Sequence, residues 1–295
     1  MTKVTINDEY PGLRSLRNRK IACLSLDLEQ DFGDLLDRPS YEGLDHIAEF
    51  AENFQRQRIP LTCFVQGSIL ETHPAQIKEL LAIDVDFGLH SYSHPKPRTR
   101  NVELEVKQGK RAYQQFFGKD PKGYRSPCCV IDQSDFGVLS SNGFGYDSSI
   151  SPSMRPSFFN NVGKPLGPFV LEDCGMVEFP LAVLSPLLRI PLSVSYVKLF
   201  GSPFSLLIRR SRLQRFLTIN FHLHDLFSLN AAERIPYRNI PLLYRKIFRR
   251  IYHDNREAGA NILHWMISLL KLRGYQFMKM TDVHSLIKGK GSLPA

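Results

Sequence analysis

His90 and His94, in the segment His90-Ser91-Tyr92-Ser93-His94, are the sharpest chemical signal in the sequence. Histidines at positions i and i+4 lie on one side of a helical turn, which lets both imidazole rings reach one divalent ion. The pair directly follows an apolar run at 85–89 that predicts a strand. Two exposed surface histidines would have the same spacing, so a metal site needs support from other residues.

Three carboxylates stand at the end of another apolar run, Ile21–Leu28, and these are Asp27, Glu29 and Asp31. Like charges repel, and a folded protein rarely gathers them without a cation or a proton-transfer task. The alternative is a solvated acidic loop that caps a helix. Asp27 lies inside the apolar run, which favours a functional role.

Two further motifs also follow predicted strands. Arg125, in Tyr124-Arg125-Ser126-Pro127, could hold a carboxylate in a fork of hydrogen bonds. In the segment Phe221-His222-Leu223-His224-Asp225, histidines two apart on a strand point the same way unless the strand ends between them. Asp225 could set the tautomer of a neighbouring histidine. A surface arginine and structural histidines are the alternatives, and placement at strand ends favours function.

The elements that must position these residues alternate between strands and helices. Apolar runs predict strands at 21–28, 61–65, 85–89, 122–125, 145–147, 217–223 and 276–279, and helical periodicity predicts helices at 44–57, 74–81, 102–117, 134–141 and 258–273. This rhythm predicts parallel βα units. Residues 150–216 interrupt it with eight prolines among large apolar residues, and we expect an insertion that covers or flanks the site. No linker rich in Gly or Ser is present, so we predict one domain at 21–285, a lead-in at 1–20 and a tail at 286–295.

The composition is that of a soluble globular chain. Of 295 residues, 43% are hydrophobic and 23% charged, and the formal net charge is +9. Such a charge favours anionic surroundings, but there is no zinc finger, RNA-binding aromatic motif or helix-turn-helix pattern, so we do not expect nucleic-acid binding. Five irregularly spaced cysteines predict a reduced compartment. With no apolar leader and no window of about 18 apolar residues, we expect a cytosolic protein.

Taken in order, the motifs resemble those of the polysaccharide deacetylase family, the NodB-homology or family 4 carbohydrate esterases. The family pattern runs from an Asp-containing strand end through His-(Ser/Thr)-x-x-His, Arg-x-Pro and Asp-Ser-Ser to Leu-His-Asp. The matching segments here begin at Leu26, His90, Arg125, Asp147 and Leu223, and the likeness spans about residues 20–285. The resemblance implies an α/β fold, a distorted (β/α) barrel of about seven parallel strands, with its site at the carboxyl ends of the strands.

The resemblance also implies roles for these residues. Asp27 would be the general base, and His90 and His94 would be metal ligands. The common motif has two adjacent aspartates, but the second position here is Leu28. The chain is similar to a variant branch with Asp-x-(Asp/Glu), in which Glu29 becomes the third ligand and Asp31 the alternative. Because side chains alternate along a strand, Asp27 and Glu29 can share a face.

The family chemistry is hydrolysis of an N-acetyl group on a carbohydrate with a divalent metal ion, for which we expect zinc. Two histidines and one carboxylate leave open positions for water and for the acetamide oxygen. The catalytic acid is His224 if Leu-His-Asp is aligned, or His222 if the variant branch is followed. Arg125 would hold Asp27, and Asp225 could orient the acid.

Two other functions fit the same motifs. Relatives that open small amides, such as allantoinase-like and cyclic imidase enzymes, share the scaffold and the metal site. An inactive carbohydrate-binding relative is the second, because the usual second carboxylate is absent. A small-amide hydrolase should have a closed pocket and a glycan deacetylase an open groove. The oligomeric state is left open.

Two basic clusters flank the last motif, and apolar residues are interleaved with both. They are Arg209, Arg210, Arg212 and Arg215 before it, and Arg245, Lys246, Arg249 and Arg250 after it. A basic residue near an anionic leaflet contributes about 1 kcal/mol, so we hypothesise peripheral contact with the inner face of a membrane and a sugar substrate carried by a lipid phosphate. The alternative is that both clusters are solvated helix faces whose apolar residues are simply buried in the core.

Overall fold

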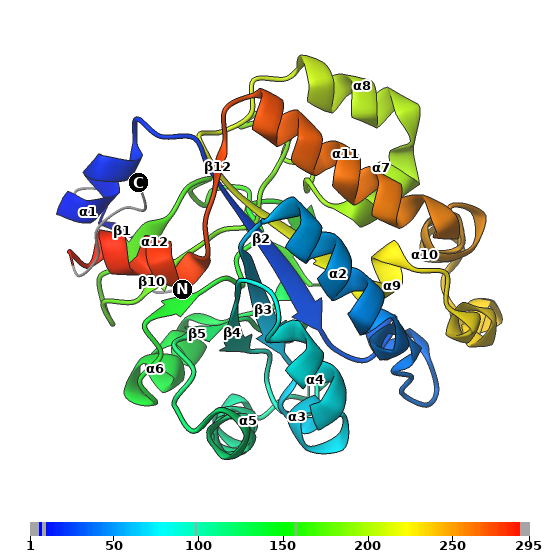
Figure 1. The fold of residues 1–295 in the computed structure, drawn as a ribbon, viewed down its shortest axis with the longest axis horizontal. Coiled ribbons are helices and arrows are strands. Elements are labelled where there is room, and N and C mark those ends of the chain that lie inside the picture. The colour runs from blue at the N-terminus through cyan, green and yellow to red at the C-terminus, as the bar shows by residue number, and fades with distance from the viewer. Residues whose placement is uncertain (1–5, 8–9, 98, 157, 290–295) are drawn as a thin grey trace.

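One large curled sheet runs through the molecule, and helices surround it (Figure 1). The computed structural model describes residues 6–7, 10–97, 99–156 and 158–289. Parts of the predicted lead-in and of the predicted tail therefore lie outside the described residues, and the division into domains stays a prediction. None of the described helices combines the length and the apolar character needed to cross a membrane.

The sheet is mostly parallel. Its strands follow the order β1-β9-β10-β6-β5-β4-β3-β2-β11, and β12 pairs with β2. Every neighbouring pair from β10 to β11 is parallel, whereas β9 is antiparallel to β1 and β10. Among the described residues β1 and β11 form the two ends of this path, so the sheet is open. It curls into a half-barrel (Figure 1). The predicted α/β class is confirmed. The strands are β1 (Ile6–Asn7), β2 (Ile21–Leu28), β3 (Leu61–Val65), β4 (Val85–Leu89), β5 (Gly123–Tyr124), β6 (Tyr146–Asp147), β9 (Phe169–Leu171), β10 (Val177–Glu178), β11 (Phe216–His222) and β12 (Gln276–Phe277), and β7 (Met154–Arg155) and β8 (Phe159–Asn160) form a separate hairpin.

Helices pack around the sheet in two groups that Figure 1 separates clearly. Helices α3, α4 and α5 lie at the bottom of the view, and α7, α8 and α11 lie together at the upper right. Short 3-10 or π-helical turns connect several of these elements. The α-helices are α1 (Pro11–Leu16), α2 (Ile47–Gln57), α3 (Gly67–Thr72), α4 (Pro74–Leu80), α5 (Val102–Phe117), α6 (Gln133–Ser141), α7 (Val194–Phe200), α8 (Ser202–Arg210), α9 (Leu223–Leu226), α10 (Leu242–Arg249), α11 (Gly259–Leu272) and α12 (Met280–Ile287).

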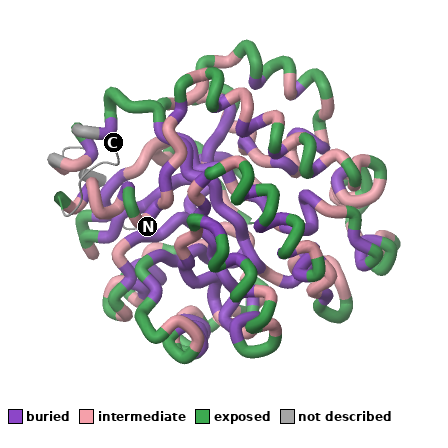
Figure 2. The backbone as a smooth tube through the Cα atoms, in the orientation of Figure 1, coloured by how far each residue is buried: buried purple, intermediate pink, exposed green. Residues whose placement is uncertain are grey.

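The core follows the strands. Strand β2 is buried along its whole length, as a central parallel strand should be when both of its faces are covered. Figure 2 shows the strands as buried chain in the middle and the outer faces of the helices as exposed chain. The apolar runs of the sequence therefore fix which segments lie inside, and the strand ends carry the polar residues.

Helices α3 and α5 approach each other and β4 very closely. A Cβ atom added at Gly67 would lie 2.9 Å from the Cα of Gly109, and one added at Gly109 would lie 2.9 Å from the Leu89 side chain. Only glycine allows such an approach. The Gly67 N–H also donates to the carbonyl of Ser91 at 2.9 Å, so this packing supports the segment that carries His90 and His94.

Residues 150–216 include two strands of the main sheet. Strands β9 and β10 extend the sheet beyond β6, while the hairpin of β7 and β8 stands outside it. The segment ends with α7 and α8, and α7 packs against α11. This stretch thus builds part of the sheet edge as well as the loops around it.

Candidate active site

Charged side chains gather where neighbouring parallel strands end. Asp27 lies near the end of β2 and Glu29 just beyond it, His90 follows β4, Arg125 follows β5, and His222 ends β11. The carboxyl ends of parallel strands meet at one edge of the sheet, which is where α/β proteins place their sites. The sheet order therefore brings together residues that are far apart in the sequence.

A buried ion pair joins Arg125 and Asp27. The Arg125 side chain is fully buried, and its Nη1 donates to Asp27 Oδ1 at 2.7 Å. Arg125 also donates to the carbonyl and the hydroxyl of Ser148, at 2.8 and 2.6 Å, and its guanidinium lies 4.3 Å from the centre of the Phe64 ring. Arg125 therefore holds the Asp27 carboxylate through a single hydrogen bond, which corrects the predicted fork, because its other two nitrogens bond Ser148.

Two more side chains hold the Asp27–Arg125 pair, and neither was predicted from the sequence. Asn220 Nδ2 donates to Asp27 Oδ2 at 2.9 Å, and Asn220 Oδ1 accepts from Arg125 Nη1 at 2.7 Å. The Ser25 hydroxyl accepts from the same nitrogen at 2.9 Å. Ser25 and Asn220 each lie two residues before a predicted site residue on the same strand, and side chains two apart share a face. That spacing is the signal that could have found them.

Glu29, His90 and His94 form a compact group of ligand atoms. Glu29 Oε2 lies 2.8 Å from His90 Nε2 and 2.7 Å from His94 Nε2. Burial acts to raise the pKa of Glu29, but the two histidines hold it well below its usual range. Burial likewise acts to lower the pKa of His94, and the charge of Glu29 raises it above its usual value. Two imidazoles and one carboxylate are a donor set that suits zinc.

The other nitrogen of each ring supports this interpretation. His90 Nδ1 lies 2.9 Å from the carbonyl oxygen of Arg125, which requires the proton on Nδ1 and leaves the lone pair of Nε2 directed at the group. His94 Nδ1 is buried and has no hydrogen-bond partner among the described residues. The residues present therefore fit a divalent ion held by His90, His94 and Glu29.

The segment that carries the two histidines is not helical, which corrects the prediction of a helical turn. Ser91 and His94 both adopt the left-handed region, with φ of 59° and 55°. The Glu105 carboxylate on α5 organises this loop, because it accepts hydrogen bonds from the backbone N–H groups of Tyr92 and Ser93 and from the Ser91 and Ser93 hydroxyls, at 2.7–2.9 Å. The rings converge because of this loop geometry. Nothing in the sequence near the motif pointed to Glu105.

His222 stands beside Asp27 and Glu29 and is oriented by Asp225. Its Nδ1 lies 2.8 Å from Asp225 Oδ2, and its Nε2 lies 3.7 Å from Asp27 Oδ2 and 3.8 Å from Glu29 Oε1. Asp225 is fully buried and also accepts from the Ser195 hydroxyl at 2.6 Å. Burial acts to lower the pKa of His222, but the hydrogen bond with Asp225 and the nearby carboxylates raise it to about 9. The side chain is 25% exposed, so it can reach a bound molecule.

His224 has a different environment. Strand β11 ends at His222, and the His224 ring stacks on the His222 ring at 4.7 Å. Its Nδ1 accepts from the backbone N–H of Phe32 at 3.1 Å, and burial lowers its pKa to about 4. Glu29, His222 and His224 also offer ligand atoms within 4.8 Å of one another. The contacts of Glu29 with His90 and His94 are shorter, so we assign the ion to that group.

Asp31 does not join the ligand group. Its carboxylate accepts from the Gly43 N–H at 3.2 and 3.3 Å, and burial raises its pKa to about 6. Neither ligand group found among the described residues includes it. The alternative in which Asp31 is the third ligand therefore finds no support in this arrangement.

Comparisons with known proteins point to one family. Residues 40–146 match the family model for polysaccharide deacetylase, a range that contains His90, His94 and Arg125. This part of the chain therefore resembles a polysaccharide deacetylase domain. A peptidoglycan deacetylase of Helicobacter pylori is 26% identical over 137 residues, which cover 45% of this chain and 47% of that protein. The match thus spans about half the length of this curated relative.

Solved structures share the fold of this chain. A candidate polysaccharide deacetylase from Mycobacterium smegmatis matches with a TM-score of 0.56 at 14% identity, over 92% of this chain and 91% of that one. A pseudoenzyme of carbohydrate esterase family 4 from Bacillus anthracis matches with a TM-score of 0.51 at 12% identity, over 91% of this chain and 66% of that one. At these identities the likeness shows the fold alone. The same fold occurs in a pseudoenzyme, so catalysis has to be argued from the residues of the site.

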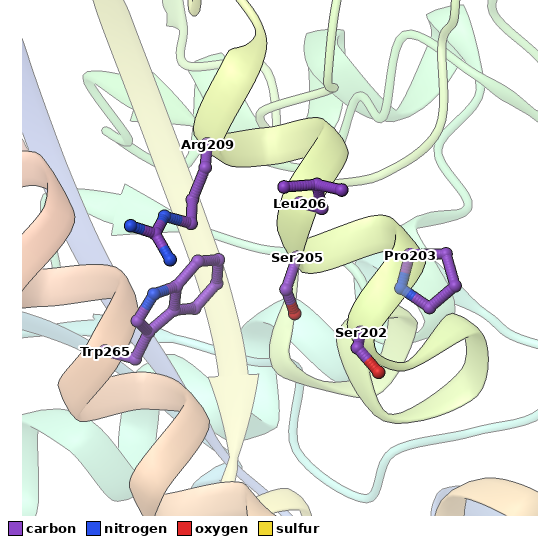
Figure 3. Close-up of a pocket in the computed structure, with 6 residues that line it drawn as sticks. All are labelled: Ser202, Pro203, Ser205, Leu206, Arg209 and Trp265. Carbon is purple, nitrogen blue, oxygen red and sulfur yellow. The ribbon is translucent and has the colours of Figure 1, made fainter.

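A hollow on the surface of the molecule lies apart from this site. It encloses about 560 Å³ between α8 and α11 (Figure 3). Its lining residues are Ser202, Pro203, Ser205, Leu206, Arg209 and Trp265. None of them belongs to the groups around Asp27, Glu29 and His222, so this hollow is separate from the candidate active site.

Proposed function

We propose that this protein is a metal-dependent deacetylase that hydrolyses an N-acetyl group on a carbohydrate. The observation that carries the proposal is the ligand group of Glu29, His90 and His94, with the Asp27–Arg125 pair on one side and the Asp225–His222 pair beside it. Hydrolysis of an amide needs a proton acceptor for water and a proton donor for the leaving amine. Asp27 and His222 supply both.

The metal would be held by Glu29, His90 and His94, and the donor set favours zinc. A divalent ion bound there polarises the acetamide carbonyl and lowers the pKa of water. Glu29 supplies one negative charge to the group, and the Arg125 carbonyl keeps the His90 ring in the correct tautomer. These residues would bind and orient the ion in a largely buried place.

Asp27 would act as the general base. Arg125 and Asn220 hold its two oxygens, at 2.7 and 2.9 Å, so the carboxylate is fixed beside the ligand group before the substrate arrives. As water attacks the carbonyl carbon, Asp27 accepts its proton, and no reorientation is needed.

His222 would act as the acid. Its Nε2 faces Asp27 and Glu29, and its Nδ1 is anchored on Asp225. It gives a proton to the amine nitrogen as the C–N bond breaks, which releases acetate and the free amino sugar. His224 lacks this anchor, and the Phe32 N–H occupies its Nδ1, so the arrangement favours His222 over His224.

The test combines metal content with acetate release. Purified protein should contain about one divalent ion per chain and should release acetate from at least one member of a panel of N-acetylated sugars and oligosaccharides. His94→Ala should lose both properties. His253→Ala, at a side chain that is 41% exposed and pairs with Glu233 and Asp254 outside the ligand group, should keep both. Acetate release that survives in His94→Ala would reject the proposed metal site, and a metal-loaded protein inactive on every amide would reject the function.

A further inference from the structure

Helix α10 lies on the surface and exposes its apolar residues. Leu242 and Leu243 are 64% and 68% exposed, and no residue of the helix is fully buried. The sequence alternative, in which the apolar residues of this cluster are simply buried in the core, is therefore wrong for these two leucines. Leucines left in water on a surface helix indicate a surface that meets an apolar partner.

A row of aromatic rings connects α10 to the active site. Tyr244 lies 6.2 Å from Phe248, Phe248 lies 6.2 Å from Tyr252, and Tyr252 packs against Phe32 at 5.0 Å and against His224 at 5.6 Å. These rings thus connect the exposed end of α10 to the side of the active site where His222 and His224 lie.

Other segments with exposed apolar residues continue this surface from α10. The Tyr244 hydroxyl lies 3.5 Å from the Pro156 carbonyl, in the segment of Met154, which is 61% exposed. That segment and the one that follows it contact Arg189, which donates to the carbonyls of Pro152 and Lys164 at 3.3 and 2.9 Å. We call residues 150–156, 158–165, 183–191 and 237–250 together the rim surface. Its exposed large apolar residues are Met154, Phe158, Val162, Leu187, Leu188, Leu242 and Leu243.

All charged residues of the rim surface are basic. It contains eight Lys or Arg residues and no Asp or Glu: Arg155, Lys164, Arg189, Arg238, Arg245, Lys246, Arg249 and Arg250. Of these eight side chains, only that of Arg249 has a carboxylate within 4.0 Å among the described residues, and this is the carboxylate of Asp254 at 3.9 Å. Neighbouring acidic groups therefore leave most of this positive charge unneutralised, and two copies of such a surface would repel each other.

We propose that the rim surface docks on an anionic phospholipid bilayer and turns the active site toward it. Exposed leucines on a basic, surface-lying helix are the features by which a protein enters the interface of an anionic membrane. The docking itself does not depend on the proposed function. In combination with it, the substrate is an N-acetylated sugar carried on a membrane lipid.

The other basic cluster provides the contrast. Residues 209–215 precede β11, and the Arg215 carbonyl accepts from the backbone N–H of Ile21 at the start of β2, at 2.8 Å. This cluster therefore lies at the amino ends of the strands, away from the active site. Figure 1 shows α8 and α10 on different parts of the molecule. Leu206 and Leu207 on α8 are also exposed, at 47% and 38%, which makes them matched controls.

The experiment is co-sedimentation with vesicles of phosphatidylcholine, alone or mixed with phosphatidylglycerol, at low salt. The wild-type protein should pellet only with the anionic vesicles, and added salt should release it, because salt screens the charges. The double variant Leu242→Glu, Leu243→Glu should bind at least about tenfold more weakly, since two leucines no longer enter the interface. Lys246→Glu with Arg249→Glu should weaken binding by a similar factor.

The control variant Leu206→Glu, Leu207→Glu should bind like the wild type. Equal loss in this control and in the α10 variant would overturn the docking surface, and so would a wild-type protein that stays in the supernatant with anionic vesicles. Circular dichroism and acetate release from a soluble sugar, both unchanged in the α10 variant, show that it is folded. Absence of any acetate release with intact vesicle binding would reject the proposed function and leave the docking surface standing.

Discussion

Replacing Arg125 by methionine should destabilise the protein by about 3–5 kcal/mol, which is the usual cost of removing one partner from a buried ion pair. Arg125 is fully buried, Asp27 is 3% exposed, and their charged atoms lie 2.7 Å apart. Methionine fills most of the volume but leaves the Asp27 carboxylate buried without its counter-charge.

The structure gives a separate check on this magnitude. Two unit charges 2.7 Å apart attract by about 6 kcal/mol at an effective dielectric constant of about 20, and part of that is offset by the cost of burying both charges. The Ser148 carbonyl also loses its bond to Arg125, and a buried acceptor left without a donor costs about 1–3 kcal/mol. These terms overlap, so about 3–5 kcal/mol is the expected loss.

The assay is unfolding in urea, with free energies taken from the midpoints and slopes. The double variant Asp27→Asn, Arg125→Met removes the unpaired charge as well, and should recover about 2 kcal/mol relative to Arg125→Met alone. Arg234→Met is the control, because Arg234 and Glu42 form an exposed pair, with side chains 53% and 35% exposed, and should cost less than about 1 kcal/mol. A loss below about 1 kcal/mol in Arg125→Met, or a double variant no more stable than it, would refute the reasoning.

Three further outcomes follow from the site. Asp27→Asn should keep the metal, measured by elemental analysis, and lose about 10²–10⁴-fold in acetate release, because the proton acceptor is gone; near-normal turnover would remove Asp27 from the mechanism. His222→Ala should lose about 10²–10⁴-fold in turnover and His224→Ala less than about tenfold, and the reverse order would make His224 the acid. Burial in the first place, and then the charge of Asp147, raise the pKa of Glu178 well above its ordinary value of 4.5, so the folded state holds a proton there that the unfolded state releases. The stabilisation that this bound proton provides is therefore full below about pH 4.5 and is lost as the pH rises through the folded-state pKa. In urea unfolding between pH 5 and 9, the wild type should lose stability relative to Glu178→Gln, and parallel stability profiles of the two proteins would contradict the raised pKa.

The sequence by itself determined seven strands of the main sheet, their polar ends and which residues share a face, whereas β1, β9 and β10 were not predicted. Asp27 and Glu29 lie two apart at the end of an apolar run, so alternation placed them together and placed Leu28 in the core, where it is fully buried. Periodicity predicted helix α5 with both of its ends, and in the structure Asn101 caps its first turn through the Leu104 N–H and Gly118 ends it with a φ of 68°. These properties depend on neighbours within a few residues.

Only the tertiary structure decided which groups act on which. Asn220 meets Asp27 across 193 positions of the chain, and Glu105 shapes the His90–His94 loop from a helix. Those contacts depend on which strands are neighbours in the sheet, and local alternation carries no record of that. For the same reason His222 and His224 could not be told apart in advance, since their difference comes from Asp225 on one ring and the Phe32 N–H on the other.

The two basic clusters show the same division most clearly. Both contain arginines interleaved with leucines, and nothing in their residue types indicates which cluster lies beside the active site. The parallel sheet separates them, because one cluster precedes the start of β11 and the other follows its end. The two ends of a strand lie at opposite edges of the sheet. Composition determined that both surfaces are basic, and the direction of one buried strand decided that only the second lies beside the active site.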